Sequence, residues 1–388
     1  MSHRHSVSGD TERAKRNAVG QIVKKREVLG DHKRIYRYEY DDKGRLVRVY
    51  RGTGKHKRVV ESYTYDANGN RISATVYGTT TTGSYTLDDN LIVYGDNTYR
   101  YDEDGYLVEK TAPQGSTSYT YNTLGALTKV VLPNGTTIEY PQDVLNRRVA
   151  KKVNGQVVEK YLWEDLTTLL AVYDKDDNLI QRFEYADMRM PVAMRDAQGE
   201  KYYLHYDQVG SLCAVSDSNG NIVKEITYDT YGNIVSDSNP SFKVPFGFAG
   251  GLYDPDTKLT HFGYREYDAY TGKWTAKDPI LFAGGDSNLY GYVLNDPVNL
   301  VDPEGLWVVP LMIRIGAMGE VIYNFSEGLK WYVYKTQLHF EIQHLIDEIN
   351  LNCGCSREER DACDKQILEI LQWYIRKTGS DYIGDFSL

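Results

Sequence analysis

The sequence has few cysteines and no long apolar segment. Its 388 residues include four cysteines, Cys213, Cys353, Cys355 and Cys363. Three of them fall near the C-terminal end, so a disulfide framework does not hold the preceding part of the chain together. The segment from Trp307 to Phe325 is the most apolar, but Arg314 and Glu320 interrupt it, and we predict no membrane-spanning helix.

A positive net charge and an apolar N-terminal segment are also missing. The formal net charge of −9 argues against a nucleic-acid-binding protein, and we expect no nucleic acid on the β part. The first residues are polar and basic, without the apolar core of a signal peptide, so we expect synthesis in the cytoplasm. Residues 1–35 form a basic arm that could hold nucleic acid or anionic lipid. Because no aromatic residue precedes Tyr36, we favour a frayed or partly stranded entry into the next part.

Tyrosine and glycine are abundant instead, with 34 residues of each. From Tyr36 onward they recur in a unit in which alternating strands flank the pattern Tyr-Asp-x-x-Gly-x-Leu. Clear copies, one with Asn for Asp, begin at Tyr40, Tyr65, Tyr101, Tyr121, Tyr206 and Tyr228, and degenerate copies lie near Tyr140, Tyr173 and Tyr185. The unit predicts a β-hairpin, because the Asp side chain can bond the backbone of a turn and Gly supplies a positive φ at no steric cost.

A hairpin of about 20 residues cannot bury its apolar face alone and must stack on its neighbours. The repeats therefore predict a mainly β fold with one long antiparallel sheet, hairpin beside hairpin, over residues 36–252. Asn134-Gly135, Asn154-Gly155 and Asn219-Gly220 are typical of two-residue hairpin turns and extend the same plan.

Near the end of residues 253–306, three Asp-Pro pairs, at Asp278, Asp296 and Asp302, follow one another within about two dozen residues and end this pattern. Proline fixes φ and keeps the preceding residue extended, so each pair holds its aspartate on a stiff, non-helical corner. Such corners can direct carboxylates at one point, and they also end strands. We therefore expect an irregular plug at the end of the sheet.

Six short motifs mark this segment. They are Tyr264-Arg265-Glu266-Tyr267-Asp268, Thr271-Gly272-Lys273-Trp274, Asp278-Pro279, Asn288-Leu289-Tyr290, Asn295-Asp296-Pro297 and Asp302-Pro303-Glu304-Gly305-Leu306. Together they resemble the core-terminating segment of bacterial Rhs proteins, the YD-repeat family, which the C components of insecticidal toxin complexes share. With the repeats, the resemblance covers residues 36–306. It implies that the sheet spirals into a partial shell around the C-terminal extension and that the plug closes it. The repeats are too few to close a large shell, so the chain looks like the C-terminal part of one.

The resemblance also implies a reaction. In the family an aspartyl-type autoprotease cuts just after a terminal Gly-Leu or similar pair, which places the cut here between Leu306 and Trp307. The matching positions assign the catalytic pair to Asp278 and Asp302 and a nearby cation to Arg265, with no cofactor and no metal. Two carboxylates held close together do not both ionise readily, so one can act as an acid while the other activates water. The bulky Trp307 would slow the cut.

The alternative interpretation is that the aspartates are turn formers whose side chains bond backbone amides. We favour it for Asp254, Asp268 and Asp296, and we favour catalysis for Asp278 and Asp302. Three functions stay open. The chain is a self-cleaving shell fragment of a polymorphic toxin used in bacterial competition, a structural or adhesive YD-repeat surface, or an inactive remnant. The first implies delivery by a secretion system. Its implied partners are the rest of a larger shell, a component of the secretion apparatus and a cognate immunity protein.

The composition changes after Leu306, and residues 307–388 predict a small helical extension. An apolar stripe at helical spacing runs from about Glu327 to Asn350. Ser356 and Glu359 form a capping box that opens a second helix. The sequence names no reaction for this tail.

Cysteine and histidine in the tail leave three alternatives open. Cys353, Cys355 and Cys363, with His339 or His344, are compatible with a metal site, a disulfide or free thiols, and we favour free thiols. His339, Glu341 and His344 could serve a toxin activity. The two histidines are spaced poorly for one helix face, so we favour ordinary surface positions.

Overall fold

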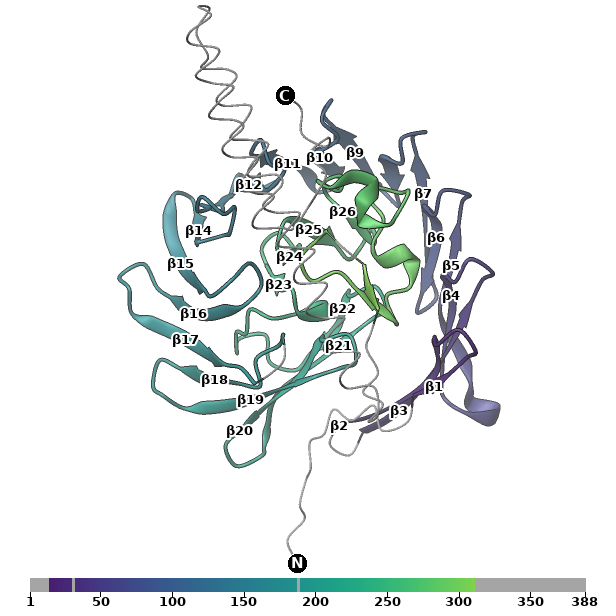
Figure 1. Ribbon diagram of the computed structural model, residues 1–388, viewed down its shortest axis with the longest axis horizontal. Helices are drawn as coiled ribbons and strands as arrows, with labels where there is room; N and C mark the ends of the chain where they lie inside the picture. The colour runs from purple at the N-terminus through teal and green to yellow at the C-terminus, as the bar shows by residue number, and fades with distance from the viewer. Residues whose placement is uncertain (1–13, 30–31, 187–188, 307, 311–388) are drawn as a thin grey trace, which may run out of the picture. The chain divides into compact units, whose positions relative to one another are not determined.

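The computed structural model describes residues 14–29, 32–186, 189–306 and 308–310, in which strands and turns dominate. A 22-stranded sheet contains strands β1 to β22, and each strand pairs antiparallel with the next one along the chain (Figure 1). Its strands are β1 (Lys15–Arg16), β2 (Ile22–Leu29), β3 (His32–Tyr40), β4 (Leu46–Arg51), β5 (Arg58–Tyr65), β6 (Arg71–Val76), β7 (Thr79–Tyr85), β8 (Leu91–Tyr94), β9 (Asn97–Tyr101), β10 (Leu107–Ala112), β11 (Gly115–Tyr121), β12 (Leu127–Val131), β13 (Thr137–Glu139), β14 (Ala150–Val153), β15 (Gln156–Trp163), β16 (Leu169–Tyr173), β17 (Leu179–Glu184), β18 (Ala193–Asp196), β19 (Lys201–Tyr206), β20 (Leu212–Asp217), β21 (Ile222–Tyr228) and β22 (Ile234–Asp237). The predicted long antiparallel sheet is confirmed.

The Tyr-Asp-x-x-Gly pattern makes a three-residue hairpin turn. In the first copy, Asp41 Oδ1 accepts hydrogen bonds from the amides of Lys43 and Arg45, at 3.0 and 2.9 Å. Gly44 has a φ of 83°, a left-handed conformation that is unfavourable for residues with a side chain. The pairing register of β3 and β4 shifts between Glu39 and Tyr40, as at a β-bulge. A type I turn followed by a left-handed glycine is a common hairpin connection, and it explains why Asp and Gly recur three residues apart.

Tyrosine hydroxyls link neighbouring hairpins. The first tyrosine of several repeats donates its hydroxyl hydrogen bond to a backbone carbonyl 14 to 19 residues earlier. These pairs are Tyr40 with Ile22, Tyr65 with Leu46, Tyr85 with Arg71 and Tyr185 with Leu169. The ring covers apolar neighbours while the hydroxyl satisfies a backbone acceptor, which accounts for the abundance of tyrosine.

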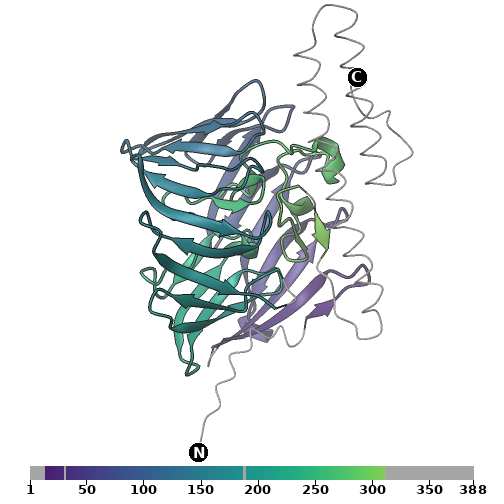
Figure 2. The same cartoon turned by 60° about the vertical axis from the view of Figure 1, so that its left-hand side comes forward.

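A second, shorter segment fills the curve of the sheet (Figures 1 and 2). It contains a four-stranded sheet of β23 (Leu252–Tyr253), β24 (Thr260–Phe262), β25 (Arg265–Asp268) and β26 (Lys273–Trp274), and a pair of β27 (Leu300–Val301) with β28 (Val309–Pro310). The described residues contain four short 3-10 helices, η1 (Gly54–His56), η2 (Phe248–Gly250), η3 (Leu281–Gly284) and η4 (Val293–Asn295). We call residues 246–306 the plug.

The plug completes the core of the sheet. Three hydrophobic clusters line the large sheet, and each includes a plug side chain, namely Leu252, Val298 or Leu259. A fourth cluster is centred on plug aromatics, with Tyr267 and Tyr292 ring centroids 4.3 Å apart. Because the sheet alone would leave these apolar faces open, the plug and the sheet depend on each other for burial.

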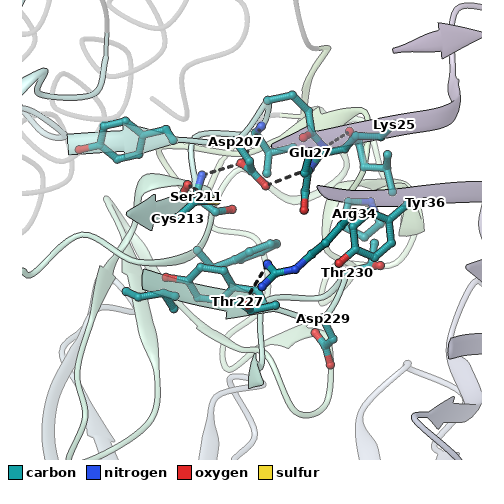
Figure 3. A pocket seen from close by; sticks show the side chains of 18 of the residues that line it. Lys25, Glu27, Arg34, Tyr36, Asp207, Ser211, Cys213, Thr227, Asp229 and Thr230 are labelled. Carbon is teal, nitrogen blue, oxygen red and sulfur yellow. Dashed lines mark hydrogen bonds and ion pairs between the residues drawn. The ribbon is translucent and has the colours of Figure 1, made fainter. Parts of the chain in front are cut away.

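The two ends of the large sheet approach each other through side chains. Arg34 of β3 contacts Glu225 of β21 at 3.0 Å. Figure 3 shows Arg34 beside Thr227, and Lys25 of β2, which lies 3.8 Å from Asp207. No backbone pairing joins these two ends within the described residues. We call this contact the seam. It contains a pocket of about 100 Å³ whose lining includes Glu61.

Strands β1, β2 and the start of β3 lie within residues 1–35, as in the favoured partly stranded entry, and Ile22 packs in the same cluster as Tyr36 and Tyr38. One detail differs from the sequence-based expectations. The predicted two-residue hairpin turn is found at Asn154-Gly155, but not at the other two Asn-Gly pairs. At Asn134 and Asn219 the following glycine ends the same three-residue turn as in the repeats. The Leu132 amide donates a hydrogen bond to the Thr136 carbonyl across the first turn, and the Asp217 amide donates one to the Asn221 carbonyl across the second. The expected helices of the tail lie outside the described residues.

Candidate functional site

Arg265, Asp278 and Asp302, predicted to act together, form one buried cluster. The Arg265 Nη2 lies 2.8 Å from Asp278 Oδ2 and 3.2 Å from Asp302 Oδ2. The three residues are 4%, 6% and 2% exposed, respectively. One guanidinium nitrogen therefore holds two carboxylates next to each other in a setting that excludes most water.

Local backbone geometry places each group. Arg265 begins β25, where its guanidinium carbon lies 4.3 Å from the centre of the Trp274 ring. Asp278 stands on its Asp-Pro corner and accepts a hydrogen bond from the Ile280 amide at 3.0 Å. Asp302 follows β27 on a second corner. Stiff corners thus direct both aspartates at one cation, as the Asp-Pro pairs suggested.

The chain after Asp302 folds back onto the same cluster. The Leu306 amide donates a hydrogen bond to Asp302 Oδ1 at 2.9 Å, and Arg265 Nε donates to the Gly305 carbonyl. Gly305 has a φ of 69°, and a Cβ there would lie 2.6 Å from the Phe262 carbonyl oxygen. The turn therefore requires glycine and holds the buried Leu306 beside the aspartates. Trp307 lies outside the described residues.

Gly284, which the sequence analysis did not single out, lies between the carboxylate and the Leu306 carbonyl. A Cβ on Gly284 would be 2.7 Å from Asp278 Oδ2 and 2.9 Å from the Leu306 oxygen. Both oxygens therefore lie close to the position that a Cβ would occupy, so only glycine fits there. The consecutive glycines Gly284-Gly285, soon after an Asp-Pro corner, were the available sequence signal.

Burial shifts the proton equilibria of this cluster. It raises the pKa of Asp278 to about 6, with Asp302 adding to the rise and Arg265 opposing it. Burial, together with the charge of Asp302, also raises the pKa of Glu304 to about 7. A buried carboxyl can thus keep its proton close to neutral pH while a second carboxylate remains paired with arginine.

The other aspartates of the plug bond to turns and to neighbouring side chains. Asp268 accepts from the Tyr270 amide at 3.0 Å, and Asp296 accepts from the Asn299 side chain at 2.8 Å. Asp254 accepts from the Asp256 amide and also pairs with Lys151 of the large sheet at 2.8 Å. These contacts are those expected of turn formers, and Asp254 additionally ties the plug to the sheet.

A metal site and a membrane-spanning helix each have structural requirements, which can be compared with the described part of the chain. There, no group of three or more His, Cys, Asp or Glu residues is placed to hold a metal ion. Within the same residues no helix is long and apolar enough to cross a bilayer. Cys213 is a free cysteine at the seam. The cysteines and histidines of the tail lie outside the described residues.

Comparison with known proteins gives the family. The Teneurin YD-shell family matches residues 10–298, a span that includes Arg265 and Asp278 and ends before Asp302. The chain belongs to the YD-shell family. The predicted relationship to Rhs and YD-repeat proteins is thereby confirmed.

Several relatives resemble most of this chain. Teneurin-3 of Danio rerio is 32% identical over 362 residues, which are 88% of this chain and 13% of the relative. The tRNA3(Ser)-specific nuclease WapA of Bacillus spizizenii is 30% identical over 280 residues, 68% of this chain and 12% of that protein. This chain thus spans a small part of the relatives it matches. A crystal structure described as TcdB2-TccC3-TEV matches 76% of this chain and 19% of its own, with 19% identity and a TM-score of 0.40.

Proposed function

We propose that this chain is the C-terminal part of a YD-repeat shell that cuts itself between Leu306 and Trp307. One observation carries the proposal. The Asp278 carboxylate and the Leu306 carbonyl oxygen converge beside Gly284, while Asp302 accepts a hydrogen bond from the Leu306 amide. Asp278 therefore lies beside the carbonyl group of the bond that would be cut, Asp302 binds the preceding peptide unit, and Arg265 contacts both carboxylates.

In the proposed reaction the two aspartates divide the acid and base roles. Protonated Asp278 donates its proton to the Leu306 carbonyl oxygen. Ionised Asp302, stabilised by Arg265, accepts a proton from a water molecule whose oxygen bonds to the carbonyl carbon.

The resulting tetrahedral intermediate then breaks its bond to the nitrogen of Trp307. That nitrogen leaves as an amine with the proton held by Asp302, and one hydroxyl returns its proton to Asp278. Both carboxyl groups end in their starting states, and the reaction needs no cofactor.

A denaturing gel of freshly purified protein tests the proposal. Cleavage gives two bands whose masses add to the full 44.3 kDa, with the smaller fragment beginning at Trp307 by N-terminal sequencing. Asp302→Asn should leave one full-length band, whereas Asp296→Asn, a change at a turn former, should still be cut. Efficient cleavage of the Asp302→Asn protein would rule out this pair of acids.

The family supports a wider role for the chain. The nuclease WapA is a relative, which supports a toxin-like tail on the same kind of shell. We propose that a bacterial secretion system delivers the protein and that its partners are the rest of a larger shell, a component of that system and an immunity protein. Co-purification of the chain with the neighbouring part of such a shell would test the first of these partners.

A structural role is the second candidate. Arg265 pairs with both carboxylates at once, an arrangement that also suits a plug held together by a buried ion network. The match to the Teneurin YD-shell family, which covers residues 10–298, is compatible with such a structural role. A single uncut band at 44.3 kDa after prolonged incubation would favour this function or an inactive remnant.

A further inference from the structure

Lys273 is a buried lysine with an unusual set of partners. It is 4% exposed at the start of β26, and its Nζ lies 2.6 Å from Asn70 Oδ1 and 3.3 Å from Asn288 Oδ1. Other buried lysines of the described chain, Lys25, Lys151 and Lys224, each pair with a carboxylate. Within the described residues, no carboxylate oxygen lies in ion-pair contact with Lys273 Nζ, which instead faces amide oxygens.

Both polar atoms of the Asn70 side-chain amide make hydrogen bonds. Its Oδ1 accepts from Lys273 and, at 2.7 Å, from Asn288 Nδ2. Its Nδ2 donates to Asp89 Oδ1 at 2.6 Å and to Asp66 Oδ2 at 3.0 Å. The carbonyl is thus polarised by a donor, and the amide nitrogen lies against two carboxylates.

This environment favours a neutral amine on Lys273. Burial lowers its pKa to about 7, although the charges of Asp89, Asp66 and Asp286 oppose that effect, and Arg71 adds to it. The Tyr85 ring lies 4.7 Å from Nζ on one side. A desolvated lysine with a lowered pKa is a nucleophile at neutral pH.

We propose that Lys273 and Asn70 join in a self-catalysed isopeptide bond. The Nζ attacks the Asn70 side-chain carbonyl carbon, and Asn288 Nδ2 stabilises the negative charge that develops on Oδ1. Asp89 Oδ1 lies 2.6 Å from Nδ2 and comes within reach of Nζ as Nζ closes on the carbonyl carbon, where it accepts a proton from Nζ and passes it to Nδ2. The bond between the carbonyl carbon and Nδ2 then breaks, and ammonia leaves. The reaction consumes no other reactant.

The bond would tie the plug to the large sheet. Asn70 directly precedes β6, whereas Lys273 begins β26, and the two residues are 203 positions apart in the chain. A covalent link across such a long loop removes many conformations of the unfolded chain and so favours the folded state. Both residues precede Leu306, so the link is independent of the proposed self-cleavage and would survive it.

Tryptic peptide mapping by mass spectrometry tests the proposal on the full chain. Trypsin should fail to cut at Lys273, and a branched peptide of residues 59–71 joined to residues 266–277 should appear with the loss of one ammonia. Ammonia loss without a branched peptide, as from a succinimide at Asn68-Gly69, would contradict the proposal. So would the absence of the branched peptide after long incubation of folded protein at pH 8.

Matched variants separate chemistry from folding. Asn70→Ala and Lys273→Arg should abolish the branched peptide, and Lys224→Met, which removes another buried lysine, should leave it in place. Asp89→Asn should slow its formation by about 100-fold or more, because the proton carrier is lost. Circular dichroism checks that each variant is folded. Unchanged bond formation in folded Asp89→Asn protein would overturn the proposed proton transfer.

Discussion

The pH dependence of self-cleavage follows from the buried state of Asp278. The proposed reaction needs its protonated form, and burial raises its pKa to about 6. At pH 7 about a tenth of the molecules would carry that proton, and each further pH unit would lower the fraction about tenfold. We therefore expect the rate to fall about tenfold per unit above pH 7. Asp278→Asn should lower the rate by about 10²- to 10⁴-fold, as expected for losing a general acid.

The assay follows the uncut band on gels after the protein is diluted into buffers between pH 5 and 8. Glu304 is the neighbouring carboxyl that could produce a similar profile, since its pKa is raised to about 7. In Glu304→Gln protein the fall above pH 7 should persist if Asp278 is the acid. A rate that stays constant from pH 5 to 8 would refute the assignment, and so would efficient cutting by the Asp278→Asn protein.

Three further changes have expected outcomes. Gly284→Ala should slow cleavage with little change in the circular dichroism spectrum, because its Cβ would meet the Asp278 carboxylate and the Leu306 carbonyl; unaltered cleavage would contradict this. Arg265→Ala should destabilise the fold by about 3–5 kcal/mol in urea titrations, since it leaves two buried carboxylates unpaired. Burial raises the pKa of Glu61 to about 7 from an unfolded value near 4.5, so stability should fall by up to about 3 kcal/mol between pH 4.5 and 7. Glu61→Gln should remove this pH dependence in urea titrations, and an unchanged slope would show that other groups cause it.

The repeats allowed the large sheet to be predicted with little ambiguity. Each turn is specified locally, because Asp41 bonds amides two and four residues ahead and Gly44 takes the left-handed conformation. Antiparallel neighbours joined by short turns need no long-range information, so the order of the strands follows the chain. The Asp-Pro corners likewise specified, from residues close together in sequence, an irregular plug without an α-helix.

Contacts between distant residues could not be read from the sequence. The site depends on the approach of Gly284 to both Asp278 and Leu306, which the packing of the plug decides. Nothing in the sequence distinguished Lys273 from other lysines, because its contact with Asn70 depends on the curvature of the sheet.

By itself the sequence determined the hairpins, their order and the residues that turn the chain, because those interactions span only a few positions. Only the tertiary structure decided which buried groups meet across the sheet and the plug. That outcome depends on how 22 strands curve together, a sum of small twists that no single repeat encodes.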